Sequence, residues 1–83
     1  MSKFDIYKSD CDYLLSNGWS KECFTYKIPD DENYEDIFVK GDVALVWGYY
    51  YPNTWHEFKY SDASYINGLP DNYKRIDIYE TTI

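Results

Sequence analysis

Cysteine is scarce in this chain, so disulfide bonds cannot be what holds it together. The 83 residues include two cysteines, Cys11 and Cys23, too few for the framework of a disulfide-stapled secreted scaffold. No window approaches the roughly 20 apolar residues of a membrane span, and Asp5 interrupts the apolar core that a signal peptide needs. We therefore expect no membrane partner, a location in the reducing cytoplasm of a host bacterium, and both cysteines buried as small apolar groups.

Alanine and arginine are also rare, whereas several residue types whose codons are rich in A and T are abundant. Alanine occurs at positions 44 and 63 and arginine at position 75, whereas tyrosine, asparagine, isoleucine and lysine are abundant. The genetic code, rather than physical chemistry, connects this bias to a low-GC genome. The composition indicates a Gram-positive bacterium, or its phage or plasmid, as the source.

No residue pattern specifies a reaction. Catalysis by a thiol needs a cysteine, a histidine to deprotonate it and a third group to orient the histidine. Cys11, Cys23 and His56 are available, but nothing in the neighbouring sequence marks them as such a site. We therefore predict a protein that is not an enzyme, with no catalytic residue, and keep a small enzyme or ligand-binding domain that uses His56 with either cysteine as an alternative.

Metal-binding patterns fail as well. Asp31, Asn33 and Glu35 imitate the first alternating ligands of a calcium loop, but Asp36 stands where that loop requires glycine and Asp42 where it requires glutamate. Two distant cysteines and one histidine match no zinc spacing. We predict neither a metal site nor a cofactor.

Negative charge is what the chain has in excess. It carries 15 acidic and 8 basic residues, a net charge of −7, and residues 1–42 hold −5 of that charge. Such a field repels phosphates, which disfavours direct binding to nucleic acid. Solubility alone is a sufficient explanation for much of the charge; the more specific interpretation is a partner with a basic surface.

Periodicity predicts a small α+β domain over residues 1–83. Ser9 and an acid three residues later form a capping signal for a short N-terminal helix over 9–17, which Asn17-Gly18 ends. Residues 1–8 alternate in polarity, as in a short edge strand or an ordered arm. The expected architecture is an antiparallel sheet of four to five strands, with the helix packed on one face.

Alternation of apolar and polar residues predicts the strands. Residues 31–40 fit two structures, a helix begun by an acidic first turn or a strand over 37–40 that Gly41-Asp42 joins to the next strand; the β-rich neighbours favour the strand. A helical turn is expected over 61–67. The other predicted strands cover 21–28, 43–51, 54–60 and 73–79, with the second of these central because it is apolar on both faces as far as Trp47.

Two groups of residues are candidates for partner binding. One is an acidic cluster whose carboxylates could contact basic side chains. The other is an aromatic group whose members cannot all be buried on one side of a strand, so we expect some of the rings to be exposed as interface anchors. The acidic cluster is Asp30, Asp31, Glu32, Glu35 and Asp36, and the aromatic group is Tyr49, Tyr50, Tyr51 and Trp55, beside Trp47.

Size, charge, aromatic content and the absence of site chemistry together favour an inhibitor. The expected function is a small acidic protein, encoded by a phage or mobile element, that blocks the basic nucleic-acid-binding surface of a host defence protein. Anti-CRISPR and anti-restriction proteins are of this type, and nucleic-acid mimicry is one way in which they act. An immunity protein that neutralises a nuclease toxin, and a structural protein of a virion, remain alternatives.

Overall fold

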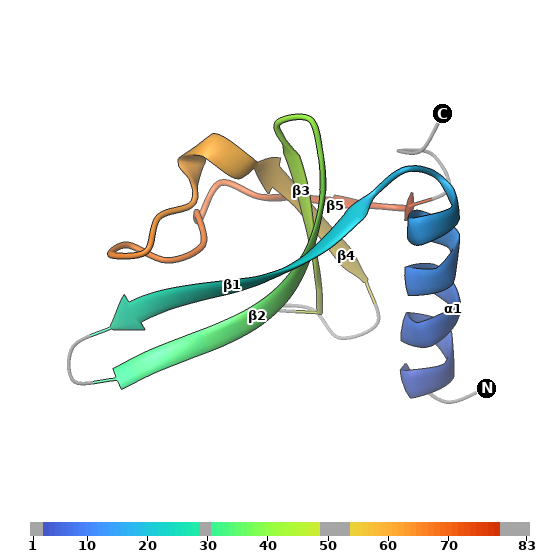
Figure 1. The fold of residues 1–83 in the computed structure, drawn as a ribbon, viewed down its shortest axis with the longest axis horizontal. Coiled ribbons are helices and arrows are strands. Elements are labelled where there is room, and N and C mark those ends of the chain that lie inside the picture. Colours follow the sequence, from blue (N-terminus) through green and yellow to red (C-terminus); the bar gives the residue numbers. More distant parts are fainter. Residues whose placement is uncertain (1–2, 29–30, 49–53, 79–83) are drawn as a thin grey trace.

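The computed structural model describes residues 3–28, 31–48 and 54–78, which form one α-helix and a five-stranded antiparallel sheet (Figure 1). The strands follow one another in space as they do in the chain, in the order β1-β2-β3-β4-β5. This arrangement confirms the predicted α+β class. The elements are α1 (Lys3–Ser16), β1 (Ser20–Ile28), β2 (Asp31–Lys40), β3 (Val43–Trp47), β4 (Trp55–Lys59), a 3-10 turn (Tyr60–Asp62) and β5 (Lys74–Ile76).

The helix is longer than the sequence predicted. It begins at Lys3, so the expected strand or arm over residues 1–8 is wrong and Ser9 lies inside α1 instead of capping it. Tertiary packing explains the difference, because Tyr7 lies two residues before the expected start and contacts the rings of Trp47 and Trp55. The predicted end is confirmed: Gly18 has a φ of 89°, the left-handed conformation that ends a helix.

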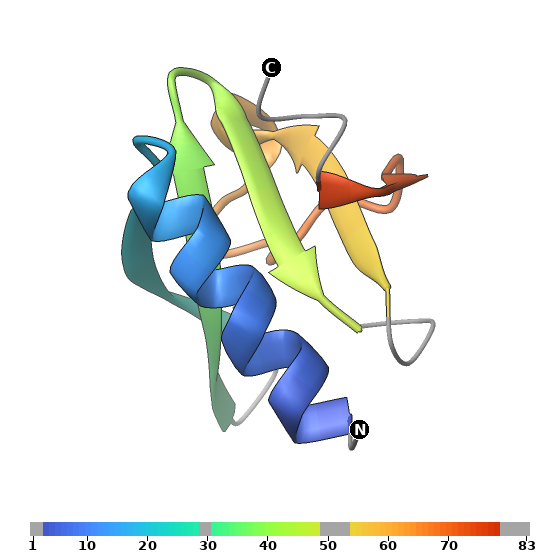
Figure 2. The same ribbon diagram turned by 90° about the vertical axis from the view of Figure 1, so that its right-hand side faces the viewer.

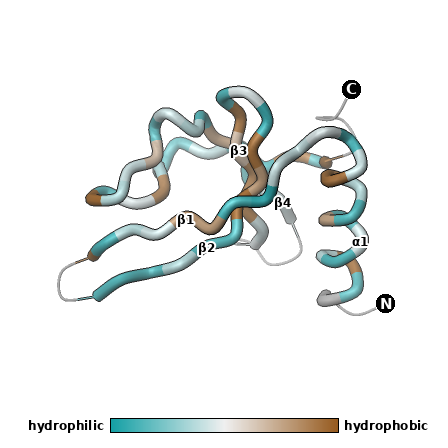
Figure 3. Tube along the Cα trace, in the orientation of Figure 1, coloured by the Kyte–Doolittle hydropathy of each residue, from teal (hydrophilic) through white to brown (hydrophobic). Residues whose placement is uncertain are grey.

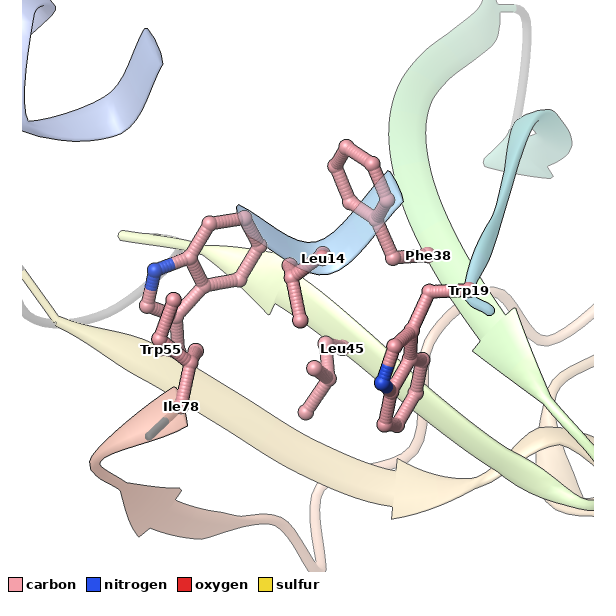
Figure 4. Packing of buried hydrophobic residues seen from close by; sticks show 6 residues of the cluster. All are labelled: Leu14, Trp19, Phe38, Leu45, Trp55 and Ile78. Atoms are coloured by element: carbon pink, nitrogen blue, oxygen red, sulfur yellow. The ribbon is translucent and has the colours of Figure 1, made fainter. Parts of the chain in front are cut away.

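One face of the sheet is covered by α1 (Figure 2). The buried cluster on this face, the helix-side core, joins residues from the helix, the loop after it, three strands and the C-terminal segment (Figure 4). A buried hydrogen bond also ties the helix to the sheet, since the Trp55 indole donates Nε1–H to Asp10 Oδ2 at 2.9 Å. The cluster contains Leu14, Trp19, Phe38, Leu45, Trp55 and Ile78.

The opposite face is covered by the segment from residue 60 to 70. Ile37, Ala44, Val46 and Phe58 form a second buried cluster there, with side chains of this segment packed against it. The segment also reaches β1, where a Cβ atom on Gly68 would lie 2.9 Å from the Tyr26 ring. Glycine is required at this position both for that approach and for its φ of +80°.

The structure settles residues 31–40 as a strand, longer than the predicted 37–40. Gly41, with a φ of 64°, makes the expected tight turn into β3. β3 is central, as predicted, and covers Val43–Trp47. Gly48 is outside the strand, contrary to the predicted bounds of 43–51, and residues 49–51 lie outside the described residues. The last elements are shorter than predicted: the turn covers Tyr60–Asp62 instead of 61–67, and β5 covers three residues instead of seven, because few of its residues pair with β4.

A candidate protein-binding surface on the β1–β2 ribbon

β1 and β2 continue past the end of β3 as a two-stranded ribbon that projects away from α1 (Figure 1). Pairing of β2 with β3 ends at Ile37, whereas pairing of β2 with β1 continues to Asp31. We call residues 23–28 and 31–36 the ribbon. Its β2 arm is strongly hydrophilic, and the 60–70 segment lies along the other arm, β1 (Figure 3). The ribbon therefore presents its acidic arm to solvent away from the main core.

Strand alternation divides the predicted acidic cluster between the two faces of the ribbon. Glu32 and Asp36 share a face with Tyr34, while Asp31 and Glu35 lie on the other. The cluster is therefore a band around one arm and not a single acidic face. Asp30 lies outside the described residues. Glu35 is partly buried, and this burial, followed by the negative charge of Asp36, raises the pKa of its carboxyl group above the usual value.

Two exposed tyrosines bracket one of these acids. Tyr34 is 65% exposed and Tyr65 is 48% exposed. The Tyr34 hydroxyl lies 3.4 Å from Glu32 Oε2, and the Tyr65 hydroxyl lies 3.5 Å from Glu32 Oε1. These distances are long for hydrogen bonds between oxygens, so they establish proximity more than bond strength. Exposed Ile66 follows Tyr65 in the chain, and exposed Ile28 ends the ribbon's β1 arm.

Tyr65 is held at the ribbon by backbone and charge. Its carbonyl oxygen accepts a hydrogen bond from the Lys27 backbone N–H at 2.7 Å, and the Lys27 ammonium group lies 5.9 Å from the centre of its ring. These contacts fix the backbone of Tyr65 and place its ring beside Lys27. We call Glu32, Tyr34, Tyr65 and Ile66 the ribbon tip.

Trp55, the one described residue of the predicted aromatic group, does not lie on this surface. Trp55 is 2% exposed and belongs to the helix-side core, so the prediction that it contacts a partner does not fit its position. Strand alternation turns it inward, against Phe38 and Trp47. Tyr49, Tyr50 and Tyr51 lie outside the described residues.

Two other acids, Glu22 and Asp42, anchor the start of the 60–70 segment. Glu22 accepts a hydrogen bond from the Tyr60 hydroxyl at 2.7 Å, a contact that raises the pKa of Tyr60. Asp42 accepts from the Ser61 backbone N–H at 2.9 Å and from its hydroxyl at 3.0 Å. Both contacts anchor the start of the 60–70 segment. The acid excess therefore has two parts, one structural and one carried by the ribbon.

The cysteines and the histidine do not come together as a thiol site. Cys11 packs against the helix-side core, where burial raises the pKa of its thiol, and Cys23 is exposed on β1, contrary to the prediction that both are buried. His56 follows Trp55 on β4 and so faces the other side of the sheet, with its ring 4.7 Å from that of Tyr73. Burial, and then the charge of Arg75, lowers the pKa of His56.

Tyr34 and Tyr65 are the residues that sequence reasoning missed. The signal for Tyr34 was present, since an aromatic residue between acids on a strand exposed on both faces has no core to enter. Tyr65 gave no signal, because its position depends on the 60–70 segment returning to β1. That contact joins residues far apart in the chain, which no local pattern records.

Neither a membrane helix nor a metal cluster is found within residues 3–28, 31–48 and 54–78. No helix there has the length and apolar character to cross a membrane, and no group of three or more His, Cys, Asp or Glu side chains is placed to hold a metal ion. Comparison with family models, with curated proteins and with solved structures gives no match.

Proposed function

We propose that this protein is a small acidic inhibitor that binds the basic, nucleic-acid-binding surface of another protein. The observation that carries the proposal is the ribbon tip, where two exposed tyrosine rings bracket a carboxylate on a strand that bears three more acids. Tyrosine rings bury much area for few rotamers and are common at the centres of interfaces. Carboxylates beside them pair with arginine and lysine.

The position of the ribbon supports a binding role. Its acids lie outside the two buried clusters, so they can pair with a partner without disturbing the core. The one ion pair that involves the ribbon's β2 acids among the described residues is loose, with 3.8 Å between Lys21 Nζ and Asp36 Oδ2. Exposed pairs of this kind contribute little to stability. A basic partner would compete with Lys21 at small cost.

The composition supports a source and a target class. A low-GC bias is consistent with a phage or mobile element of Gram-positive bacteria, whose natural targets are defence proteins that handle nucleic acids, such as CRISPR effectors and restriction enzymes. An immunity protein against a nuclease toxin would use the same surface. The identity of the partner distinguishes the two functions. An inhibitor of this type would bind a host defence protein, and an immunity protein would bind a toxin with its own nuclease activity.

A matched pair of charge variants tests the proposal. The ribbon variant combines Asp31→Asn, Glu32→Gln, Glu35→Gln and Asp36→Asn, and the control variant neutralises four exposed acids elsewhere, with asparagine at Asp5, Asp12, Asp62 and Asp71. Tagged wild-type protein and both variants are used to capture partners from lysates of low-GC bacteria.

We expect the wild type and the control to capture the same nucleic-acid-binding protein, and the ribbon variant to lose it. Binding of the purified partner should also weaken steeply as salt rises, since charge attraction drives it. Equal capture by the ribbon variant, or affinity independent of salt, would contradict the proposal. Tyr34→Ala and Tyr65→Ala should weaken binding, whereas Leu15→Ala, at a 50% exposed apolar residue on α1, should not.

A further inference from the structure

A hollow of about 320 Å³ lies where β3 ends and β2 continues. Its lining comes from three elements: Tyr7 on α1, Trp47 at the end of β3, and Tyr34, Glu35 and Asp36 on β2. Ligand pockets measure about 300–1,000 Å³, so this hollow is at the small end of the range. It suits a single side chain better than a cofactor.

Aromatic rings and carboxylates meet in this hollow. The centres of the Tyr7 and Trp47 rings lie 5.6 Å apart, and Trp47 packs in turn on Trp55 at 5.3 Å. The two lining rings are thus held in place by the helix-side core. A cation is attracted to the face of such rings and to the two lining acids, Asp36 on the Tyr34 face of β2 and Glu35 on the other face. Burial, and then the negative charge of Asp36, raises the pKa of Glu35, and a cation bound beside both acids would offset the second of these effects.

The edge of β2 beside the hollow has no strand partner among the described residues. The Lys27 backbone N–H donates to the Tyr65 carbonyl on the outer side of β1. The backbone N–H and C=O of Lys27 therefore point away from β2, and those of Tyr26 point toward it. Asn33, the register partner of Tyr26, therefore points to β1. By alternation, the N–H and C=O of Tyr34 point the other way, away from β1 and toward the side of β2 on which residues 37–40 pair with β3.

We infer that the hollow receives an arginine side chain from an extended segment of the partner, which pairs with the β2 edge at Tyr34. Pairing at this edge would direct a side chain of the added strand toward Trp47 and Asp36. Arginine fits better than lysine, because a planar guanidinium stacks on rings and donates to two carboxylate oxygens at once. That the segment belongs to a basic partner protein rests on the proposed function. That the hollow binds a guanidinium group does not depend on it.

Peptides test the inference without the partner. The probe is acetyl-Thr-Val-Arg-Val-Thr-amide, and the control replaces its arginine with citrulline, which has nearly the same shape and no charge. Each is titrated into 15N-labelled protein. The arginine peptide should shift the Trp47 indole N–H signal saturably, and the citrulline peptide should not.

The charge variants locate the site. Glu35→Gln with Asp36→Asn should weaken binding of the arginine peptide at least tenfold, while Asp62→Asn with Asp71→Asn leaves it unchanged. Equal shifts from both peptides, or shifts that avoid Trp47, would overturn the inference. Failure of the peptide titration would not affect the proposed function, because capture of the partner tests that function separately. Failure of the capture experiment would not affect an arginine site that the titration had measured.

A second pair of variants tests the strand edge. Tyr34→Ala and Tyr34→Pro both remove the ring, but only proline removes the outward N–H, at a position where the β1–β2 pairing does not use it. Proline should weaken binding about threefold to tenfold more than alanine, as expected for one lost hydrogen bond. In an antiparallel pair, the arginine opposite Tyr34 directs its own N–H to β2, so a peptide N-methylated at this arginine should show the same loss with wild-type protein. Unchanged affinity for the methylated peptide would refute pairing at this edge.

Discussion

The buried hydrogen bond between Trp55 and Asp10 makes the sharpest prediction about the fold. It joins α1 to β4 at 2.9 Å, and it is buried, since Trp55 is 2% exposed and Asp10 is 8% exposed. In Asp10→Ala the indole N–H loses a charged acceptor, at a cost of about 1.5–3 kcal/mol. Alanine returns about 0.5 kcal/mol as the better helix former. The expected net loss is about 1–2.5 kcal/mol.

The matched control is Asp12→Ala, which removes the same charge from an exposed position on the same helix. Urea unfolding followed by tryptophan fluorescence measures both variants. Asp10→Ala should also lower Tm by about 4–8 °C for each kcal/mol lost in a domain of this size, while Asp12→Ala stays near the wild type. In a Trp55→Phe background, Asp10→Ala should cost about 1 kcal/mol less. Equal stability of the two alanine variants would refute this account of how the helix is attached.

Three further predictions concern a tight turn and two titrating groups. Gly68→Ala should destabilise more than Gly41→Ala in urea unfolding, because both have positive φ but only Gly68 lies against a ring; equal losses would contradict this. The pKa of Glu35 is raised above 4.5 in the folded state, so the stability it contributes is present below that pH and is lost as pH rises. Glu35→Gln should therefore gain stability relative to the wild type between pH 4 and about 7; a difference independent of pH would refute it. The pKa of His56 is lowered below 6.5, so its contribution is present above that pH and is lost on acidification. His56→Phe should lose less stability than the wild type between pH 7 and about 5, and an unchanged slope would count against that assignment.

Local patterns were sufficient for the elements whose contacts are local. Alternation located the strands, and Gly41 and Gly18 marked a hairpin turn and a helix end, because each pattern reports backbone geometry within a few residues. The start of α1 was out of reach, since Tyr7 is ordered by Trp47 and Trp55, some 40 or more positions further along the chain.

The candidate site was predictable in part. The acids of β2 were identified, but their division between two faces followed only once residues 31–40 were known to be a strand. Tyr34 and Tyr65 were not among the predicted residues, and Tyr65 reaches Glu32 through a contact between residues 33 positions apart. Composition therefore indicated the chemistry of the surface, while tertiary structure decided which rings belong to it.

Competition with nucleic acid tests the central claim most directly. The captured partner is loaded with a fluorescently labelled nucleic acid, and wild-type protein or the ribbon variant is titrated in while anisotropy is followed. The wild type should release the nucleic acid, the ribbon variant should fail to do so, and rising salt should weaken the wild type's effect. A stable ternary complex, in which the wild type binds while the nucleic acid stays in place, would contradict the claim that the two share one surface.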